Sequence, residues 1–278
     1  MFDLTPDARM QRSQGRASVG FAARNGSAKL ATLHQSGSAK AMLPRVAGSV
    51  PEVVFLNTSG GLTGGDTLVY HLDIPAKTEV TATTQTAERG YATTGGQARV
   101  SVTARVGAGG RLNWLPQETL IYEAANVSRE TTVDLDAGAT CLMVETIVLG
   151  RHAMGERPTT ARLTDHRMIR REGRPVWTET LKLDETALSL TSQPAILGGA
   201  RAFAVIALVA PGAQDATGSI RSLLTEPGCQ SAASGWDGKL LVRILAHDGW
   251  PLRRQTARVL RALNRTLPRV WQMQGVDL

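Results

Sequence analysis

The stretch that decides the fold, NTSGGLTGGDTLVYHLDI, runs from Asn57 to Ile74. Its glycines fit the phosphate-loop pattern G-x-x-x-x-G-K-[S/T], except that Asp66 stands where the pattern has lysine. That lysine neutralises the β- and γ-phosphates of a bound nucleotide. A carboxylate in its place repels phosphate by roughly 4 kcal/mol per pair of unit charges at ~4 Å and an effective dielectric near 20. The stretch therefore argues against a nucleotide site.

The residues after Asp66 argue the same way, because a phosphate loop leads into a helix whose amides hold the phosphate. Here every second residue is apolar, which predicts a strand; these residues are Leu68, Tyr70, Leu72 and Ile74. The glycines then build a tight turn. Asp66 either accepts backbone amides of that turn or presents its carboxylate to a ligand.

Similar short segments follow one another from residue 17 to about residue 210, separated by Gly, Asn, Asp and Pro. Many short strands with regular turn signals predict an all-β sandwich, barrel or solenoid. No strict repeat accompanies them, so period alone does not indicate a regular solenoid. The predicted strands are 19–23, 28–34, 53–57, 68–74, 79–84, 98–106, 111–115, 118–122, 128–135, 140–149, 161–171, 174–183 and 202–210.

The last quarter of the chain changes pattern. A helix is predicted over 215–225, weakened by Gly218, then a strand over 240–246 and a longer helix over 251–269. The longer helix has an apolar stripe made by Leu252, Val259, Leu260, Leu263 and Leu267. Its arginines, Arg254, Arg258, Arg261 and Arg265, share another face. That face is either solvated or a contact for an acidic partner.

Composition bounds the class of protein. The 278 residues form one large domain or two small ones, and 42% hydrophobic with 20% charged residues suits a soluble globular protein. Cys141 and Cys229 lie far apart, which gives neither a zinc nor a disulfide pattern. The polar amino terminus lacks a signal peptide, and no apolar run reaches the ~20 residues that span a bilayer. We expect a cytoplasmic location and no membrane partner.

The net charge of +7 comes from basic residues spread along the whole chain, without the clusters and stacking aromatics of a nucleic-acid surface. We therefore expect no nucleic-acid partner. The sequence also lacks the G-x-S-x-G and H-E-x-x-H motifs, and its five histidines are scattered. A Ser-His-Asp site can still assemble in space, so a β-rich hydrolase stays an alternative that single Ser or His changes would test.

Three stretches carry polar residues where a core should be apolar: TTQTAER at 83–89, WLPQET at 114–119 and CLMVETIVLGR at 141–151. In the third stretch, Glu145 lies on the same strand face as Met143 and Ile147. A lone buried carboxylate is costly, so it must be paired, be protonated or reach a wet cavity. Arg151 or another arginine can supply a purely structural pair; ion handling is the other interpretation.

With these stretches the sequence resembles the UreD/UreH family of urease accessory proteins. The matching segments, in the family's order, are NTSGGLTGGD, VTATTQTAERGYATTGGQARV, LNWLPQETLIY and LGRHAMGE, with a weaker match in IRREGRPVWTE. Family members commonly have an apolar residue and then Tyr-Arg after the Thr-Thr-Gln stretch, where this chain has Gly90-Tyr91-Ala92. The resemblance covers the chain from about residue 15 to its end.

The resemblance implies a mainly β, irregular solenoid-like body with about two helices near the C-terminus. It implies one UreD-like domain over 1–278, with 1–16 as a flexible tail and 211–278 as a helix-containing part packed on the β body. It also implies a chaperone rather than an enzyme, which helps to load nickel into apo-urease together with UreF and the GTPase UreG. The implied protein holds no permanent cofactor and handles nickel transiently, through an internal polar passage.

Imidazole and thiolate groups bind nickel more strongly than oxygen and amide groups do. Because a passage must release the ion, we expect its wall to carry oxygen and amide groups. The residues predicted to touch nickel on its way are Asp66, Glu88, Glu118 and Glu145. Those predicted to line the passage or contact partners are Gln85, Gln117, Arg151 and Glu156. The competing hypothesis is a scaffold that bridges urease and the GTPase complex without handling the ion.

Overall fold

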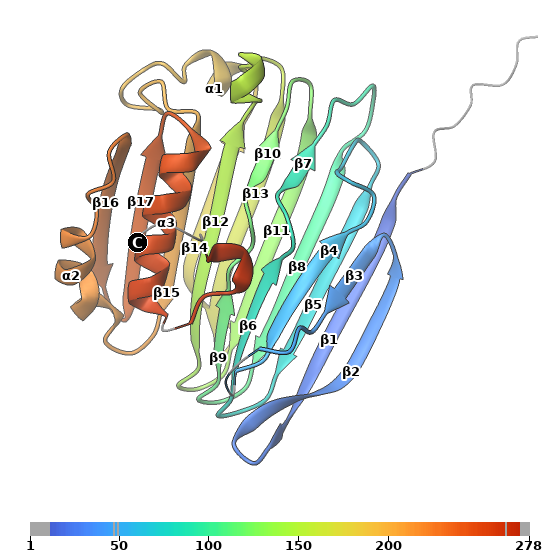
Figure 1. The fold of residues 1–278 in the computed structure, drawn as a ribbon, viewed down its shortest axis with the longest axis vertical. Helices are drawn as coiled ribbons and strands as arrows, with labels where there is room; N and C mark the ends of the chain where they lie inside the picture. Colours follow the sequence, from blue (N-terminus) through green and yellow to red (C-terminus); the bar gives the residue numbers. More distant parts are fainter. Residues whose placement is uncertain (1–11, 47, 49, 265, 273–278) are drawn as a thin grey trace, which may run out of the picture.

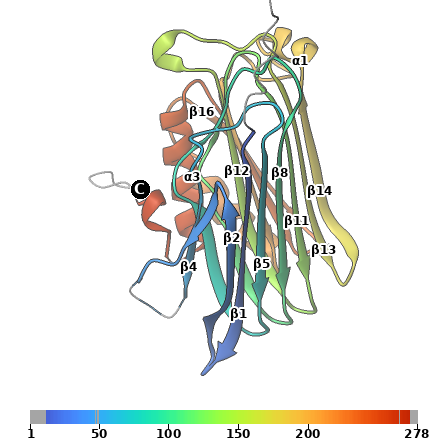
Figure 2. The same cartoon turned by 90° about the vertical axis from the view of Figure 1, so that its right-hand side faces the viewer.

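The protein is built from two β-sheets that lie face to face, with a helix against the outside of one of them (Figures 1 and 2). The computed structural model describes residues 12–46, 48, 50–264 and 266–272. The first sheet has seven strands in the order β14-β13-β11-β8-β5-β1-β2. The second has ten, eight of them in the order β16-β17-β15-β12-β9-β6-β4-β3, with β10 beside β12 and β7 beside β10. The predicted mainly β, solenoid-like fold is confirmed.

The middle of the molecule is a solenoid, because the chain alternates between the two sheets and each return pairs in parallel with the previous coil. Strands of the first sheet are β5 (Thr67–Ile74), β8 (Ala98–Val106), β11 (Asn126–Leu135) and β13 (Arg162–Arg171). Strands of the second sheet are β4 (Glu52–Asn57), β6 (Glu79–Thr84), β9 (Arg111–Trp114) and β12 (Thr140–Leu149). Two short strands, β7 (Glu88–Gly90) and β10 (Thr119–Ile121), pair with each other between coils.

Antiparallel strands close both ends of the solenoid. They are β1 (Gln14–Arg24), β2 (Ser27–Gly37) and β3 (Ala39–Met42) at one end. At the other end they are β14 (Arg174–Leu183), β15 (Ala202–Val209), β16 (Cys229–Trp236) and β17 (Lys239–Ala246). The expected tail over 1–16 overlaps β1, which begins at Gln14; residues 1–11 of that tail lie outside the described residues.

The coils differ in length, which explains why the sequence shows no repeat. In the first sheet the strands begin at Thr67, Ala98, Asn126 and Arg162, at intervals of 31, 28 and 36 residues. Parallel pairing holds the strands in register, while the turns between them absorb the differences. The coils therefore repeat in the structure, but the spacing between their strands in the sequence varies.

Three α-helices lie in the described part of the chain: α1 (Glu185–Ser189), α2 (Thr217–Ser222) and α3 (Gly249–Leu263). The helix predicted over 215–225 is shorter, since it begins as a 3-10 turn and ends at Ser222. The helix predicted over 251–269 ends at Leu263, where Asn264 is extended. Pro268 opposes a longer helix, because it supplies no N–H and its ring would clash with the Asn264 carbonyl four residues before it.

The sequence prediction missed β3, β7 and β16. The residues of β16, CQSAASGW, are small and polar, which is typical of a loop. The strand forms because Asp237 and Gly238, both at positive φ (43° and 70°), make the two-residue turn that joins it to β17. Such an Asp-Gly pair is a strong hairpin signal.

Two apolar cores hold the fold together. The larger lies between the sheets, and the smaller lies between the outer face of the second sheet and the helices α2 and α3. The predicted stripe of α3 faces this smaller core, where Leu252, Val259 and Leu260 are fully buried. Within the described residues, no helix is both long and apolar enough to cross a bilayer.

The predicted arginine face of α3 is partly used within the chain. Arg254 and Arg258 both pair with Glu226, at 2.9 Å and 3.1 Å, and the Glu226 side chain is only 6% exposed. Arg261 is exposed, and Arg265 lies outside the described residues. This face therefore attaches the helix to the chain before β16.

The glycine-rich stretch forms a tight turn before β5, as the sequence predicts. Asp66 is 5% exposed and accepts the amides of Thr63 (2.8 Å) and Ser13 (2.7 Å). The carboxylate therefore satisfies one backbone donor of the turn and one just before β1. Gly64 is required there by space, because a Cβ atom would lie 2.1 Å from both the Gly95 carbonyl and the Thr93 hydroxyl.

Replacing Gly64 by alanine is expected to lower the free energy of unfolding by about 1–3 kcal/mol, because the added methyl group overpacks this turn. The measurement is urea denaturation. Gly95→Ala is the matched control, since its added Cβ meets nothing within 4 Å and its φ is not positive. Equal midpoints for the two variants would contradict the steric argument.

Candidate functional site

Three of the predicted site residues gather at one cavity between the sheets. Glu88, Gln117 and Glu145 line a space of about 40 Å³, which we call the inter-sheet cavity. Such a volume has room for a few water molecules. The other lining residues include Tyr70, Trp114, Thr119 and Arg129, with Leu62 and valines completing the wall. The cavity thus has a largely apolar wall, which a few polar and charged side chains reach.

Glu145 is held by one hydrogen bond and one ion pair. Trp114 Nε1 donates to its Oε1 (3.0 Å), and the Arg129 guanidinium lies 2.8 Å from its Oε2. Burial raises the pKa of the Glu145 carboxyl, and the Arg129 charge lowers it only part of the way back. The arginine that pairs with Glu145 is therefore Arg129, and Arg151 pairs elsewhere.

Arg129 starts a chain of buried charges that leads to the surface. It donates to both oxygens of Asp165, at 3.0 Å and 2.6 Å, and Asp165 also accepts from Arg167 Nε at 3.0 Å. Arg167 lies 3.6 Å from Glu179, which pairs with the half-exposed Arg243 of the second sheet. The chain joins the two sheets across the core.

Sequence reasoning missed this chain, although the alternation of strand residues contains a signal for it. In β11, Arg129 shares the buried face of Val127, Thr131 and Val133. In β13, Asp165 shares the buried face of Leu163 and Ile169. Because β11 and β13 each carry one charged residue on an otherwise apolar face, and the two charges are opposite, an ion pair between these neighbouring strands could have been predicted.

Glu88 of β7 also lines the cavity and is not part of the charged chain. Its carboxylate accepts from Asn57 Nδ2 (3.2 Å) and from the amide of Arg89 (3.1 Å). Burial raises the pKa of the Glu88 carboxyl more than these donors lower it. Since Glu88 has no ion pair within the described residues, its charge is less well compensated than that of Glu145.

The loop between β9 and β10 brings Gln117 to the cavity, and the C-terminal part holds that loop. Arg253 of α3 donates to Gln117 Oε1 (2.7 Å) and to Glu118 Oε2 (3.1 Å). Trp271 Nε1 donates to the Leu115 carbonyl (2.8 Å), and Arg253 stacks on the Trp271 ring at 5.0 Å. Gln117 Nε2 is buried and has no hydrogen-bond partner among the described residues. The helix thereby fixes the orientation of a cavity side chain.

The remaining predicted site residues do not line the cavity. Asp66 caps its turn, Glu118 pairs with Arg253, and Gln85 is exposed. Arg151 and Glu156 pair with each other at 2.5 Å after the end of β12. Within residues 12–46, 48, 50–264 and 266–272, no three His, Cys, Asp or Glu side chains are arranged to hold a metal ion.

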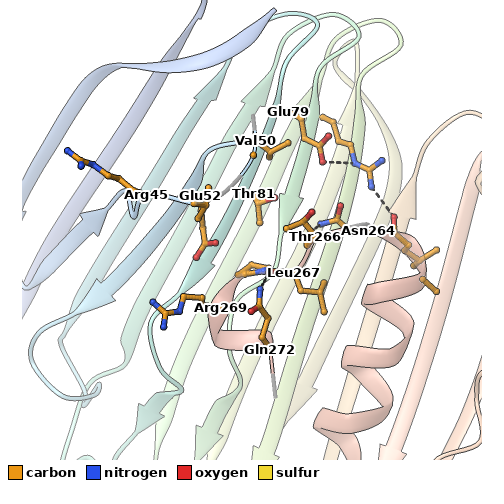
Figure 3. A pocket seen from close by; sticks show the side chains of 16 residues that line it. Arg45, Val50, Glu52, Glu79, Thr81, Asn264, Thr266, Leu267, Arg269 and Gln272 are labelled. Carbon is orange, nitrogen blue, oxygen red and sulfur yellow. Dashed lines mark hydrogen bonds and ion pairs between the residues drawn. The ribbon is translucent and has the colours of Figure 1, made fainter. Parts of the chain in front are cut away.

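A larger cleft lies on the outer face of the second sheet (Figure 3), and the sequence prediction missed it. Its volume is about 970 Å³, and it lies between strands β4, β6 and β9 and the segment after α3. The Glu52 carboxylate points into the cleft on the side of Arg269, and Glu79 lies 3.5 Å from Arg111. Segments about 200 residues apart in the sequence form this cleft, so no local motif predicts it.

Comparisons with known proteins identify similar chains. The family model described as UreD urease accessory protein matches residues 13–272. The urease accessory protein UreD of one Cereibacter sphaeroides strain is 58% identical over 264 residues, 95% of this chain and 96% of that protein. The protein of the same name from Paracoccus denitrificans is 51% identical over 274 residues, 98% and 97% of the two chains. That from Rhizobium leguminosarum bv. trifolii is 40% identical over 267 residues, 95% and 97%.

Replacing Asp165 by asparagine is expected to lower the free energy of unfolding by about 3–5 kcal/mol at pH 7, because it leaves two buried arginines undercompensated. Both arginine charges help to lower the pKa of Asp165 to about 2, against the raising effect of burial. The stability that ionised Asp165 provides is complete above its ordinary pKa of 3.8 and is lost as the pH falls toward 2. The difference between wild type and variant should therefore shrink over that range.

The measurement is chemical denaturation at a series of pH values. Asp134→Asn is the matched control, because Asp134 pairs with Arg170 on the solvent side of the same sheet. A surface pair contributes little, so this change should be much smaller. An equal loss for both variants at pH 7, or a difference that persists unchanged at pH 2, would count against the buried network.

Proposed function

The chain belongs to the UreD family of urease accessory proteins, and we propose that within urease maturation it helps to insert nickel into the apoenzyme. The proposal includes a complex with UreF and UreG, in which UreG supplies GTP hydrolysis. It agrees with the turn at 57–66, which carries Asp66 where a nucleotide site needs lysine and leads into a strand. In this proposal nickel is cargo, and the chain is not an enzyme.

The observation that carries the proposal is the inter-sheet cavity with its two carboxylates. Glu88 and Glu145 reach it from different coils, and Gln117 adds an amide. Burial raises the pKa of both carboxyls, which means that their negative charge lacks full compensation. A cation in the cavity would supply that compensation. Oxygen ligands hold nickel more weakly than imidazole or thiolate and so allow its release.

The small volume of the cavity sets a condition on any ion that passes through it. A space of about 40 Å³ cannot hold the full water shell of a divalent cation. An ion there must exchange some of its water for protein oxygens. Glu88 has the less compensated carboxylate, because its oxygens accept only from the neutral donors of Asn57 and the Arg89 amide, whereas the Arg129 charge lies against Glu145. We therefore assign the main ion contact to Glu88 and a supporting role to Glu145.

A scaffold that bridges urease and the GTPase complex is the second candidate. The observation in its favour is the same Arg129 contact, which gives Glu145 a structural role that needs no ion. A scaffold would tolerate neutral side chains at the cavity as long as the fold is kept. The two candidates therefore differ in what happens when Glu88 loses its charge.

The first experiment expresses the cognate urease with its other accessory proteins, with and without this chain. We expect assembled urease that is poor in nickel and inactive when the chain is absent. The nickel content of the purified urease measures this directly, and urea hydrolysis reports the activity. Equal nickel content in both preparations would exclude a role in nickel insertion.

The second experiment replaces Glu88 by glutamine, which keeps the shape and the Asn57 contact but removes the charge. If Glu88 contacts the ion, urease should acquire nickel about tenfold more slowly, the range found when supporting groups of metal sites are changed. Glu130→Gln is the control, because Glu130 is exposed on β11. Complex formation with both partners should persist. Normal loading by Glu88→Gln would favour the scaffold.

A further inference from the structure

The Gln117 side chain lines the inter-sheet cavity, but a residue outside the cavity holds it. Its backbone amide donates to the Thr84 hydroxyl (2.9 Å), which fixes the residue at the cavity wall, and the whole residue is only 6% exposed. Nη1 of Arg253, on α3, donates to the side-chain oxygen of Gln117, Oε1, at 2.7 Å. The orientation of this buried amide group therefore depends on a guanidinium group of the C-terminal helix.

Arg253 leaves the Gln117 amide one orientation. A guanidinium group donates hydrogen bonds and accepts none, so the oxygen of the amide must face it. The nitrogen, Nε2, then faces away from Arg253; it is buried and has no hydrogen-bond partner among the described residues. An unpaired buried donor is costly, and the inter-sheet cavity is the space where an acceptor can reach it. Gln117 therefore turns an N–H donor toward the cavity and keeps its oxygen outside.

Arg253 is itself fixed by several contacts. Its Nη1 also donates to Glu118 Oε2 (3.1 Å), and its Nη2 donates to the Val270 carbonyl. The guanidinium lies 5.0 Å from the centre of the Trp271 ring. Val270 and Trp271 belong to the 3-10 turn η3 (Arg269–Trp271), which lies beside α3 in Figure 1. The cavity amide is therefore held in its orientation without any bound ligand.

This orientation matters for a metal ion, because a cation binds to the lone pairs of oxygen atoms. Glu88 and Glu145 bring carboxylate oxygens to the cavity, and an amide oxygen is a further ligand that hard cations accept. An amide N–H group offers a cation no lone pair. An ion in the cavity thus meets one protein oxygen fewer than the side chains at its wall could supply.

We propose that Arg253 is a positioning residue that withholds the Gln117 oxygen from an ion in the inter-sheet cavity. The inference rests on the proposed function, since it takes nickel as the ion. Arg253 thereby weakens the binding of nickel and favours its release, which a protein that passes the ion on requires. Without Arg253 the amide can turn over and present Oε1 to the ion.

The test measures the affinity of the purified full chain for Ni²⁺ by calorimetric titration. Arg253→Met keeps an unbranched apolar side chain against the Trp271 ring but removes the donor. It should bind Ni²⁺ at least about tenfold more tightly than wild type, the range found when supporting groups of metal sites are changed. Damage to the fold would weaken binding, so the direction of the change separates positioning from a structural role. Arg253→Lys keeps a donor for Oε1 and should bind Ni²⁺ as wild type does.

Arg254→Met is the matched control, because Arg254 is the next residue of α3 and pairs with Glu226 at 2.9 Å. It removes the same charge and should leave the affinity within about twofold of wild type. Arg253→Met combined with Gln117→Leu separates the amide from the Glu118 carboxylate, which also loses its partner. The tightening should vanish in this double variant. Tightening that persists there, or that Arg254→Met reproduces, would overturn the proposal.

Gln117→Glu tests the same inference with Arg253 in place. Its carboxylate keeps one oxygen for Arg253 and puts the other where Nε2 lies, so the affinity for Ni²⁺ should again rise at least about tenfold. Thermal midpoints show whether each variant is folded. Affinity no higher than that of wild type in the folded variants, including the absence of measurable binding, would overturn the proposal.

Failure of this inference is separable from failure of the proposed function. If Glu88→Gln slows the nickel loading of urease while Arg253→Met and Gln117→Glu bind Ni²⁺ no more tightly, only the role of Arg253 is wrong. If urease acquires nickel equally well without the chain, the proposed function is wrong.

Discussion

The contact on which the rest of the structure depends is the Arg129 guanidinium between two carboxylates of different strands. Arg129 and Asp165 belong to the first sheet and Glu145 to the second, so the arginine joins the sheets through their core. Burying these charges costs free energy that only close pairing recovers. The same contact brings charged groups to the wall of the inter-sheet cavity, which is otherwise largely apolar.

The C-terminal part of the chain also bears on this cavity, although it packs on the outer face of the second sheet. Arg253 and Trp271 bind the loop that carries Gln117, and the apolar stripe of α3 sets where Arg253 lies. The helix thus has two roles. It covers apolar side chains of the second sheet, and it holds the loop between β9 and β10, which carries Gln117 to the cavity.

The sequence predicts the strands well where alternation is strong, as in β5, and fails where small polar residues form a strand by pairing, as in β16. It also predicts that Glu145 is paired, protonated or at a wet cavity, yet it does not identify the partner, Arg129, which comes from the neighbouring sheet. Gln117 and Glu118 are adjacent in sequence, but only Gln117 lines the cavity. The local sequence pattern predicts the strands and helices. The contacts between coils depend on turns of irregular length, which that pattern does not predict.

The unequal coils have a consequence for how such a chain can vary. In a solenoid each coil packs mainly on its two neighbours, so a longer turn disturbs little beyond its own position. Intervals of 31, 28 and 36 residues already show that this body accepts such differences. Insertions can therefore accumulate at the rims while the strands that carry Glu88, Arg129 and Glu145 stay in register. The architecture separates parts of the protein that are free to diverge from parts that are not.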